Sequence, residues 1–320
     1  MRTMNTSCTR HDWNAPDGET FSYSLWGFDP LTDERPPAVV VAIHGLSGAA
    51  LDYEPLGSHL AQRGIVTFAL ELRGQGNDPH APRRGDLEQI EDWFKDLSGF
   101  FLLVRCRYPD VPIYYYGESM GGALLTRFLA QALELEQPAG LILASPVVAL
   151  LNRPPWWQEQ LFRFLLWIRP QYRLNVRKFT KPKKNEPPKL VTRDEAHRQW
   201  FETASHKLDL FTLRFFKCLR DLINGCSDAA PRIRPPVLVI YAAHDIFIRP
   251  EQVEQFFARL GSREKELRLF PDSYHLLLHD HDKAQVLECI ESWLLRNIET
   301  AGRRSTAEAR FTSRIEKISI

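Results

Sequence analysis

The sequence predicts an α/β protein in which one helical insertion interrupts a mostly parallel, doubly wound sheet. The first observation is a series of short apolar runs without polar alternation, which is typical of parallel strands buried on both faces. The second is that helical patterns separate these runs, as in a doubly wound sheet. The third is one long stretch that lacks such a run. The apolar runs are residues 38–43, 65–70, 111–116, 140–144, 237–241 and 267–270.

Two elements near the start of the chain have clear local signatures. Phe21, Tyr23 and Leu25 alternate with polar residues after the turn-forming residues 16–18, which predicts an antiparallel hairpin at the edge of the sheet. In residues 87–104 the apolar side chains recur at spacings of three and four, which predicts an amphipathic helix.

The stretch without strand-like runs, residues 150–228, is predicted to form a helical cap inserted into a core made of residues 1–149 and 229–300. Thr192 and Glu195 have the spacing of a capping box, so a helix is expected to begin near Thr192. A later apolar pattern ends at Gly225, a residue suited to a helix C-terminus. The basic residues 301–320 are expected to form a mobile tail.

Composition excludes several classes of protein. The 320 residues carry 41 basic and 40 acidic side chains and are 44% hydrophobic, so a largely disordered chain and a strongly basic nucleic-acid binder are both excluded. Five cysteines without a CxxC pair indicate reduced thiols. No leader-like or membrane-spanning apolar stretch is visible, so we expect a cytoplasmic protein, for which peripheral contact with a membrane surface stays open.

The strongest chemical motif follows the third apolar run. Residues 117–121 read Gly-Glu-Ser-Met-Gly and lead into a helical pattern. In a G-x-S-x-G elbow a strand turns sharply into a helix, and the glycines permit the close backbone approach that projects the serine above the sheet. Ser119 is therefore the candidate nucleophile.

A serine hydroxyl needs a base to take its proton and an acid to orient that base. Asp245 directly follows the run at 237–241, and His275 follows the run at 267–270. Since both come just after predicted parallel strands, their side chains can converge with Ser119 above the same edge of the sheet. The sequence therefore predicts a Ser119, Asp245 and His275 triad.

An acyl-transfer site also needs two N–H donors for the oxyanion. The residue after the nucleophile, Met120, is expected to supply one backbone amide. The loop after the first run reads His-Gly-Leu-Ser-Gly over residues 44–48, and Leu46 is expected to supply the other.

These motifs resemble those of the α/β-hydrolase fold, and within it the monoacylglycerol lipase and lysophospholipase group, sometimes grouped with serine aminopeptidases. The matching stretches are HGLSGAALDYEPLGSHLAQRGIVTFALELRGQGND, YYGESMGGALLTRFL, LVIYAAHDIFIRP and LFPDSYHLLLHD. The resemblance implies the same triad and the same oxyanion amides. The sequence departs from the group at Glu71, Asn77, Glu118 and Ala242, none of which removes a catalytic group.

The predicted cap helix over residues 156–168 is apolar around most of its circumference. Trp156, Trp157, Leu161 and Leu165 are candidate substrate-binding residues there. An acyl-chain tunnel, contact with a lipid surface and packing against other cap helices all stay open. The cap carries 16 basic against 8 acidic residues, including Lys181, Lys183 and Lys184. This basic run could meet an anionic membrane or be a solvated loop, and both interpretations stay open.

The sequence thus predicts a serine hydrolase that cleaves esters of lipid-like alcohols and needs no metal or organic cofactor. The histidines and aspartates of residues 275–282 are not read as a metal site, because His275 is explained by the triad. A small-molecule ester, with an acyl chain, is the expected partner. A carboxylesterase, thioesterase or peptidase on the same triad, and an inactive hydrolase-like binding protein, stay open as alternatives.

Overall fold

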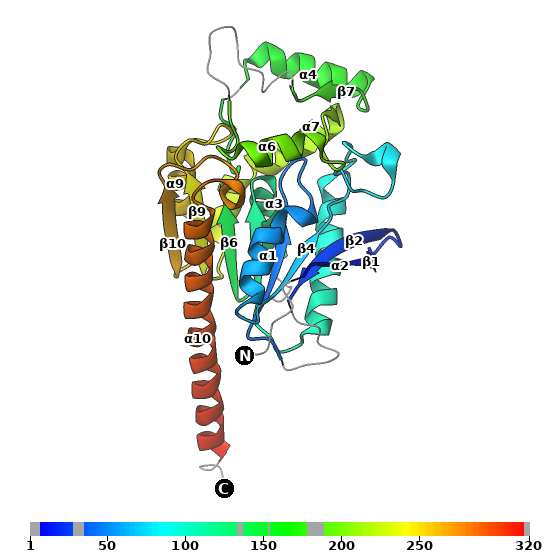
Figure 1. The fold of residues 1–320 in the computed structure, drawn as a ribbon. Helices are drawn as coiled ribbons and strands as arrows, with labels where there is room; N and C mark the ends of the chain where they lie inside the picture. Colours follow the sequence, from blue (N-terminus) through cyan, green and yellow to red (C-terminus); the bar gives the residue numbers. More distant parts are fainter. Residues whose placement is uncertain (1–6, 28–34, 133–136, 153, 178–188, 317–320) are drawn as a thin grey trace.

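The computed structural model describes residues 7–27, 35–132, 137–152, 154–177 and 189–316, with residues 301–316 described by their backbone. An eight-stranded sheet in the order β1-β2-β4-β3-β5-β6-β9-β10 forms its centre (Figure 1). β2 pairs with β1 and β4 in antiparallel fashion, and all other pairs are parallel. The strands are β1 (Thr9–Asn14), β2 (Thr20–Trp26), β3 (Val39–Ile43), β4 (Val66–Leu70), β5 (Ile113–Glu118), β6 (Gly140–Ala144), β9 (Val237–Ala242) and β10 (Lys265–Phe270).

Helices cover both faces of this sheet. In β3, Val39 and Val41 pack into one core while Val40 packs into the other, which is why the apolar runs lack polar alternation. α2, α3 and α9 pack on the first face, and α1 and α10 on the second. The helices of the core are α1 (Glu54–Ala61), α2 (Ile90–Arg107), α3 (Met120–Gln131), α9 (Pro250–Arg259) and α10 (Lys283–Glu316), with short 3-10 turns at Ala50–Tyr53, Ala81–Arg83, Ala230–Arg232 and Leu277–His279.

The mostly parallel α/β architecture predicted from the sequence is confirmed, as is the edge hairpin formed by β1 and β2. Phe21 and Tyr23 of that hairpin are buried in the core. Element boundaries differ by a few residues. The strand expected at 111–116 is β5 at Ile113–Glu118, and the helix expected at 87–104 is α2 at Ile90–Arg107.

Residues 150–228, hereafter the insertion, lie between β6 and β9. Figure 1 shows α4, α6 and α7 gathered beyond one end of the sheet, with α4 on the outer side. The expectation that the insertion has no strand was wrong, because β7 and β8 pair there as a small antiparallel sheet. Strands of three residues are too short to produce a periodic signal. The elements of the insertion are α4 (Trp156–Ile168), β7 (Arg173–Asn175), α6 (Glu195–Thr203), β8 (Leu210–Thr212), α7 (Leu213–Asn224) and α8 (Cys226–Ala229).

The capping box expected at Thr192 and Glu195 was also wrong. α6 begins at Glu195, and the side chain of Asp194 caps it by accepting the His197 N–H at 2.9 Å. Thr192 donates its hydroxyl to the carbonyl of His279 at 2.5 Å and accepts the Asp194 N–H at 3.0 Å, so it lies before the cap. α7 ends as predicted, with Gly225 as its C-cap.

At the end of the chain, α10 continues as a helix to Glu316, and the expected mobility of residues 301–320 stays a prediction. Lys181, Lys183 and Lys184 of the insertion lie outside the described residues. Among the described ranges, no helix combines the length and the apolar character needed to cross a membrane.

Candidate active site

Ser119 lies at a sharp turn between β5 and α3. Its backbone has φ 54° and ψ −117°, a conformation that non-glycine residues rarely adopt and that often marks a functional site. A Cβ added at Gly121 would lie 2.0 Å from the Ile43 carbonyl oxygen, and one at Gly117 would lie 2.7 Å from the Gly121 carbonyl oxygen. Glycine is therefore required on both sides of Ser119, as the G-x-S-x-G pattern predicts.

The structure brings Ser119, His275 and Asp245 together from three separate elements. His275 Nε2 lies 2.9 Å from Ser119 Oγ, and His275 Nδ1 lies 2.6 Å from Asp245 Oδ2. Asp245 lies in the loop after β9 and His275 in the loop after β10. Because an ionised carboxylate only accepts, Nδ1 carries the ring proton and Nε2 is free to accept from the serine hydroxyl.

The groups around His275 raise its pKa and so favour the protonated ring. Burial lowers the pKa of His275, but the charge and hydrogen bond of Asp245 and the charge of Glu118 raise it, and the net direction is upward. The pKa of Glu118 is raised to about 7, because the effect of burial outweighs the lowering effect of the nearby His275. Asp245 is held in place by the backbone, since its Oδ1 accepts the Phe247 N–H at 2.8 Å and the Ile248 N–H at 3.3 Å.

The loop at residues 44–48 lies directly against the serine. A Cβ added at Gly45 would lie 3.0 Å from Ser119 Cβ and 3.5 Å from Ser119 Oγ, so the neighbouring Leu46 is close to the nucleophile. Met120 is the first residue of α3, where a backbone N–H has no carbonyl partner within the helix. The loop that carries Leu46 and the first residue of α3 therefore both lie next to Ser119, and their role as oxyanion donors stays a prediction.

His44 holds this loop in place, a role that the sequence reasoning missed. Burial lowers the pKa of His44 to about 4, so the ring is neutral near pH 7. Its Nδ1 lies 2.9 Å from the Gly45 carbonyl oxygen, and its Nε2 accepts the Leu72 N–H at 3.1 Å. The Ser47 N–H donates to the Gln75 side-chain oxygen at 3.0 Å. The position of His44 directly after a predicted buried strand is the feature of the sequence that could have indicated this role.

The four candidate cap residues are exposed to solvent. Trp156, Trp157, Leu161 and Leu165 are between 42% and 77% exposed, and Figure 1 shows their helix, α4, on the outer side of the insertion. α4 is fastened to α7 by the ion pair of Glu159 with Arg220, at 2.8 Å. Exposure of this degree suits contact with a surface better than an enclosed acyl-chain tunnel.

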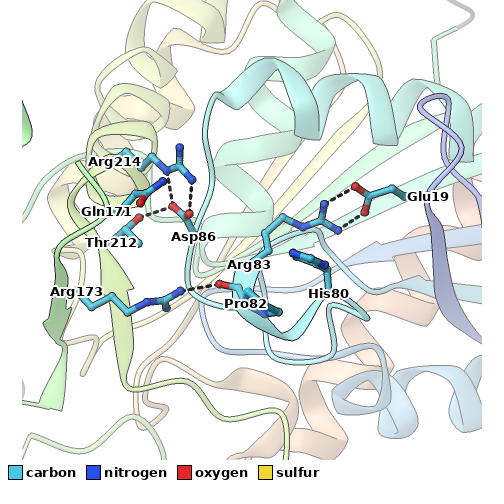
Figure 2. Close-up of a pocket in the computed structure, with 9 residues that line it drawn as sticks. All are labelled: Glu19, His80, Pro82, Arg83, Asp86, Gln171, Arg173, Thr212 and Arg214. Atoms are coloured by element: carbon cyan, nitrogen blue, oxygen red, sulfur yellow. Dashed lines mark hydrogen bonds and ion pairs between the residues drawn. The ribbon is translucent and has the colours of Figure 1, made fainter. Parts of the chain in front are cut away.

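A charged pocket of about 500 Å³ lies where the insertion meets the core (Figure 2). Asp86 accepts hydrogen bonds from Thr212 Oγ1 at 2.6 Å and from Arg214 Nε at 2.7 Å. Arg173 donates to the Pro82 carbonyl at 2.9 Å. These contacts fasten the insertion to the core beside the pocket. Its lining residues are Glu19, His80, Pro82, Arg83, Asp86, Gln171, Arg173, Thr212 and Arg214.

Comparison with known proteins shows the family of this chain. Residues 34–282 match the family described as serine aminopeptidase, S33. An uncharacterized abhydrolase domain-containing protein of Dictyostelium discoideum is 26% identical over 290 residues, which are 90% of this chain and 29% of that protein. The monoglyceride lipase of Saccharomyces cerevisiae is 24% identical over 304 residues, which are 89% of this chain and 92% of that protein.

A solved structure shares the fold. It is a soluble variant of monoglyceride lipase from Saccharomyces cerevisiae in complex with a substrate analog, with a TM-score of 0.75 and 20% identity, and the match covers 91% of this chain and 95% of that one. The family match spans most of the chain, and the sheet has the topology of the α/β-hydrolase fold. This chain therefore belongs to the serine aminopeptidase S33 family and has the α/β-hydrolase fold.

Proposed function

We propose that this protein is a serine hydrolase that cleaves carboxylic esters of lipid-like alcohols, monoacylglycerols or lysophospholipids, through an acyl-enzyme. The observation that carries the proposal is the hydrogen-bonded chain from Ser119 through His275 to Asp245 at a strained strand-to-helix turn. The similarity to a protein named monoglyceride lipase supports the ester class.

In this mechanism Ser119 Oγ attacks the ester carbonyl carbon while His275 Nε2 takes the hydroxyl proton. Asp245 keeps the proton on Nδ1 and stabilises the imidazolium that forms. The N–H groups of Leu46 and Met120 donate to the oxyanion of the tetrahedral intermediate. The intermediate then collapses, the C–O bond to the alcohol breaks, and His275 protonates the leaving alkoxide.

The acyl-enzyme is cleared by the same groups. His275 Nε2 removes a proton from water as that water attacks the acyl carbon, and a second oxyanion forms against Leu46 and Met120. Its collapse breaks the bond to Ser119 Oγ, which recovers the proton from His275. The carboxylic acid is released and the triad returns to its starting state.

A series of esters tests the substrate class. We expect kcat/KM to increase by at least about tenfold between acetyl and decanoyl glycerol esters, since each methylene buried on an apolar surface contributes roughly 0.8 kcal/mol. Hydrolysis of monoacylglycerols, lysophospholipids, thioesters and amino-acid amides under the same conditions separates the alternatives. A maximum at two to four carbons would contradict the lipid assignment, and a preference for a thioester or an amide would reassign the reaction.

The insertion is proposed to act as a lid whose helix α4 contacts an anionic membrane surface. Large apolar side chains of α4 are exposed to water, a feature that marks interaction surfaces. Trp156 is 77% exposed and Trp167 is 82% exposed. The insertion also carries twice as many basic as acidic residues, 16 against 8. A tryptophan suits the membrane interface because its ring is apolar and its N–H is polar.

Replacing Trp156 and Trp167 together by serine should weaken binding to anionic phosphatidylserine vesicles by about tenfold or more, because two large apolar contacts are lost. Sedimentation with vesicles measures this, and hydrolysis of a water-soluble ester should be unchanged. Leu102→Ser is the matched control, because Leu102 is 62% exposed but lies on α2 of the core. Equal vesicle binding by the double variant and the control would contradict the proposed surface.

A further inference from the structure

Both peptide N–H groups that flank His275 are held by hydrogen bonds. The N–H of Tyr274 donates to Asp280 Oδ2 at 2.6 Å. The N–H of Leu276 donates to the carbonyl of Val191, in the insertion, at 2.9 Å. The backbone on either side of the histidine is therefore fixed by groups outside the triad, and one of these groups belongs to the insertion.

Asp280 is a buried carboxylate at the base of the loop that carries His275. Its side chain is 0% exposed, and its Oδ1 accepts the His281 N–H at 2.8 Å and Arg193 Nε at 3.0 Å. Burial raises the pKa of Asp280, but the hydrogen bonds that its carboxylate accepts lower the pKa by more. The net direction is downward, so the group is ionised near pH 7. A buried anion needs a cation nearby. Arg193 of the insertion supplies that positive charge.

Arg193 reaches the loop at more than one point. Its backbone N–H donates to Asp280 Oδ1 at 3.2 Å, and its Nη2 donates to Asp282 Oδ2 at 2.9 Å. Asp282 Oδ2 also accepts the hydroxyl of Ser273 at 2.7 Å. The guanidinium thus contacts two carboxylates at one end of the loop from Ser273 to Asp282, and these carboxylates accept hydrogen bonds from the other end of the loop, beside His275.

The segment that carries Arg193 is itself well anchored. Thr192 donates its hydroxyl to the His279 carbonyl, and Arg198 Nη1 donates to the Thr192 carbonyl at 2.7 Å. The ring of His197 stacks on that of His279 with their centroids 4.0 Å apart. The segment can therefore hold the loop at a defined position.

We propose that Arg193 is a positioning residue for His275. Through Asp280 and the Val191 carbonyl, the insertion sets the backbone on both sides of the histidine, and so the distance and angle at which Nε2 meets Ser119 Oγ. The inference rests on the proposed role of His275 as the base. The insertion then contributes to the rate of proton transfer itself, in addition to any contact with substrate.

The test compares Arg193→Met with Arg193→Lys and with the control Arg220→Met, on a short-chain, water-soluble ester. Arg220 is matched in exposure, 23% against 27%, and makes its ion pair inside the insertion with Glu159. For Arg193→Met we expect kcat per titrated active site to fall by about 10- to 100-fold with KM within about threefold, because small misplacements of a catalytic group cost about this much. Arg193→Lys should recover most of kcat, and Arg220→Met should stay within about twofold of the unmodified protein.

Active sites are titrated with a fluorophosphonate so that unfolded molecules are not counted. A wild-type kcat per titrated site in Arg193→Met, or equal losses in Arg193→Met and Arg220→Met, would overturn the proposal. If Arg193→Met does not fold, Asp280→Asn serves instead, since its NH₂ group replaces one of the two carboxylate oxygens that accept N–H donors. A wild-type kcat in Asp280→Asn overturns the proposal equally. Where both fold, their effects should not add, because they act on one chain of contacts.

Failure of the positioning role is distinguishable from failure of the proposed function. If Ser119→Ala retains hydrolysis, the mechanism itself is wrong, whatever Arg193 does. If Ser119→Ala is inactive and Arg193→Met has normal kcat, only the positioning role is lost.

Discussion

Replacing Ser119 by alanine will lower kcat for ester hydrolysis by about a millionfold, because the covalent route needs this oxygen and the rest of the triad acts only through it. The loss will be in kcat, since the oxyanion donors and the substrate contacts remain. Steady-state hydrolysis of a water-soluble ester measures it, and labelling by a fluorophosphonate reports on the nucleophile directly. The unmodified protein should be labelled and Ser119→Ala should not.

The matched control is Ser98→Ala, which removes a hydroxyl that donates to the Phe94 carbonyl within α2, at 2.9 Å. Its kcat and labelling should equal those of the unmodified protein. Equal labelling of Ser119→Ala would mean that another residue is the nucleophile. No labelling of the folded, unmodified protein would favour the alternative of an inactive, hydrolase-like binding protein.

Replacing Asp245 by asparagine will lower kcat by about ten-thousandfold, because an amide NH₂ or a neutral oxygen facing Nδ1 no longer fixes the tautomer or stabilises the imidazolium. The change will also be visible in the pH profile. Activity requires a neutral His275, so kcat/KM of the unmodified protein should rise with pH through a pKa above the ordinary value for histidine, about 6.5.

In Asp245→Asn the burial that lowers the pKa of His275 remains, while the charge of Asp245 that raises it is gone. The acidic limb should therefore shift to lower pH even as the rate falls. Measuring kcat/KM between about pH 5 and pH 9 tests both effects. The control is Asp272→Asn, since Asp272 is an exposed carboxylate in the loop after β10, which carries His275. An unshifted limb, or a loss no larger than that of the control, would contradict the role of Asp245.

Local patterns predicted much of the fold and of the candidate site. Each apolar run became a strand of the sheet, and the interior strands are apolar on both faces because both faces are buried. Ser119 was found from its glycines, which steric contacts require. Asp245 and His275 were found because parallel strands end at one edge of the sheet, so loops distant in sequence converge there.

Other features were not visible in the sequence. Helix α6 is capped by Asp194, whereas the local spacing favoured Thr192, whose hydroxyl contacts the distant His279 carbonyl and the Asp194 N–H. The departures at Glu71 and Asn77 acquire a role only in the structure, where Asn77 donates to Glu71 at 2.9 Å near the ring of His44.

The sequence by itself therefore determined the α/β class, the edge hairpin and the positions of a serine, an aspartate and a histidine at one edge of the sheet. The tertiary structure decided how the insertion is attached, that α4 exposes its apolar side chains, and that Arg193 and Asp280 hold the loop of His275. The reason is physical. Periodicity and steric demand act between neighbours along the chain, while a buried ion pair or a side chain bound to a distant carbonyl forms only when the packed fold brings the two groups together.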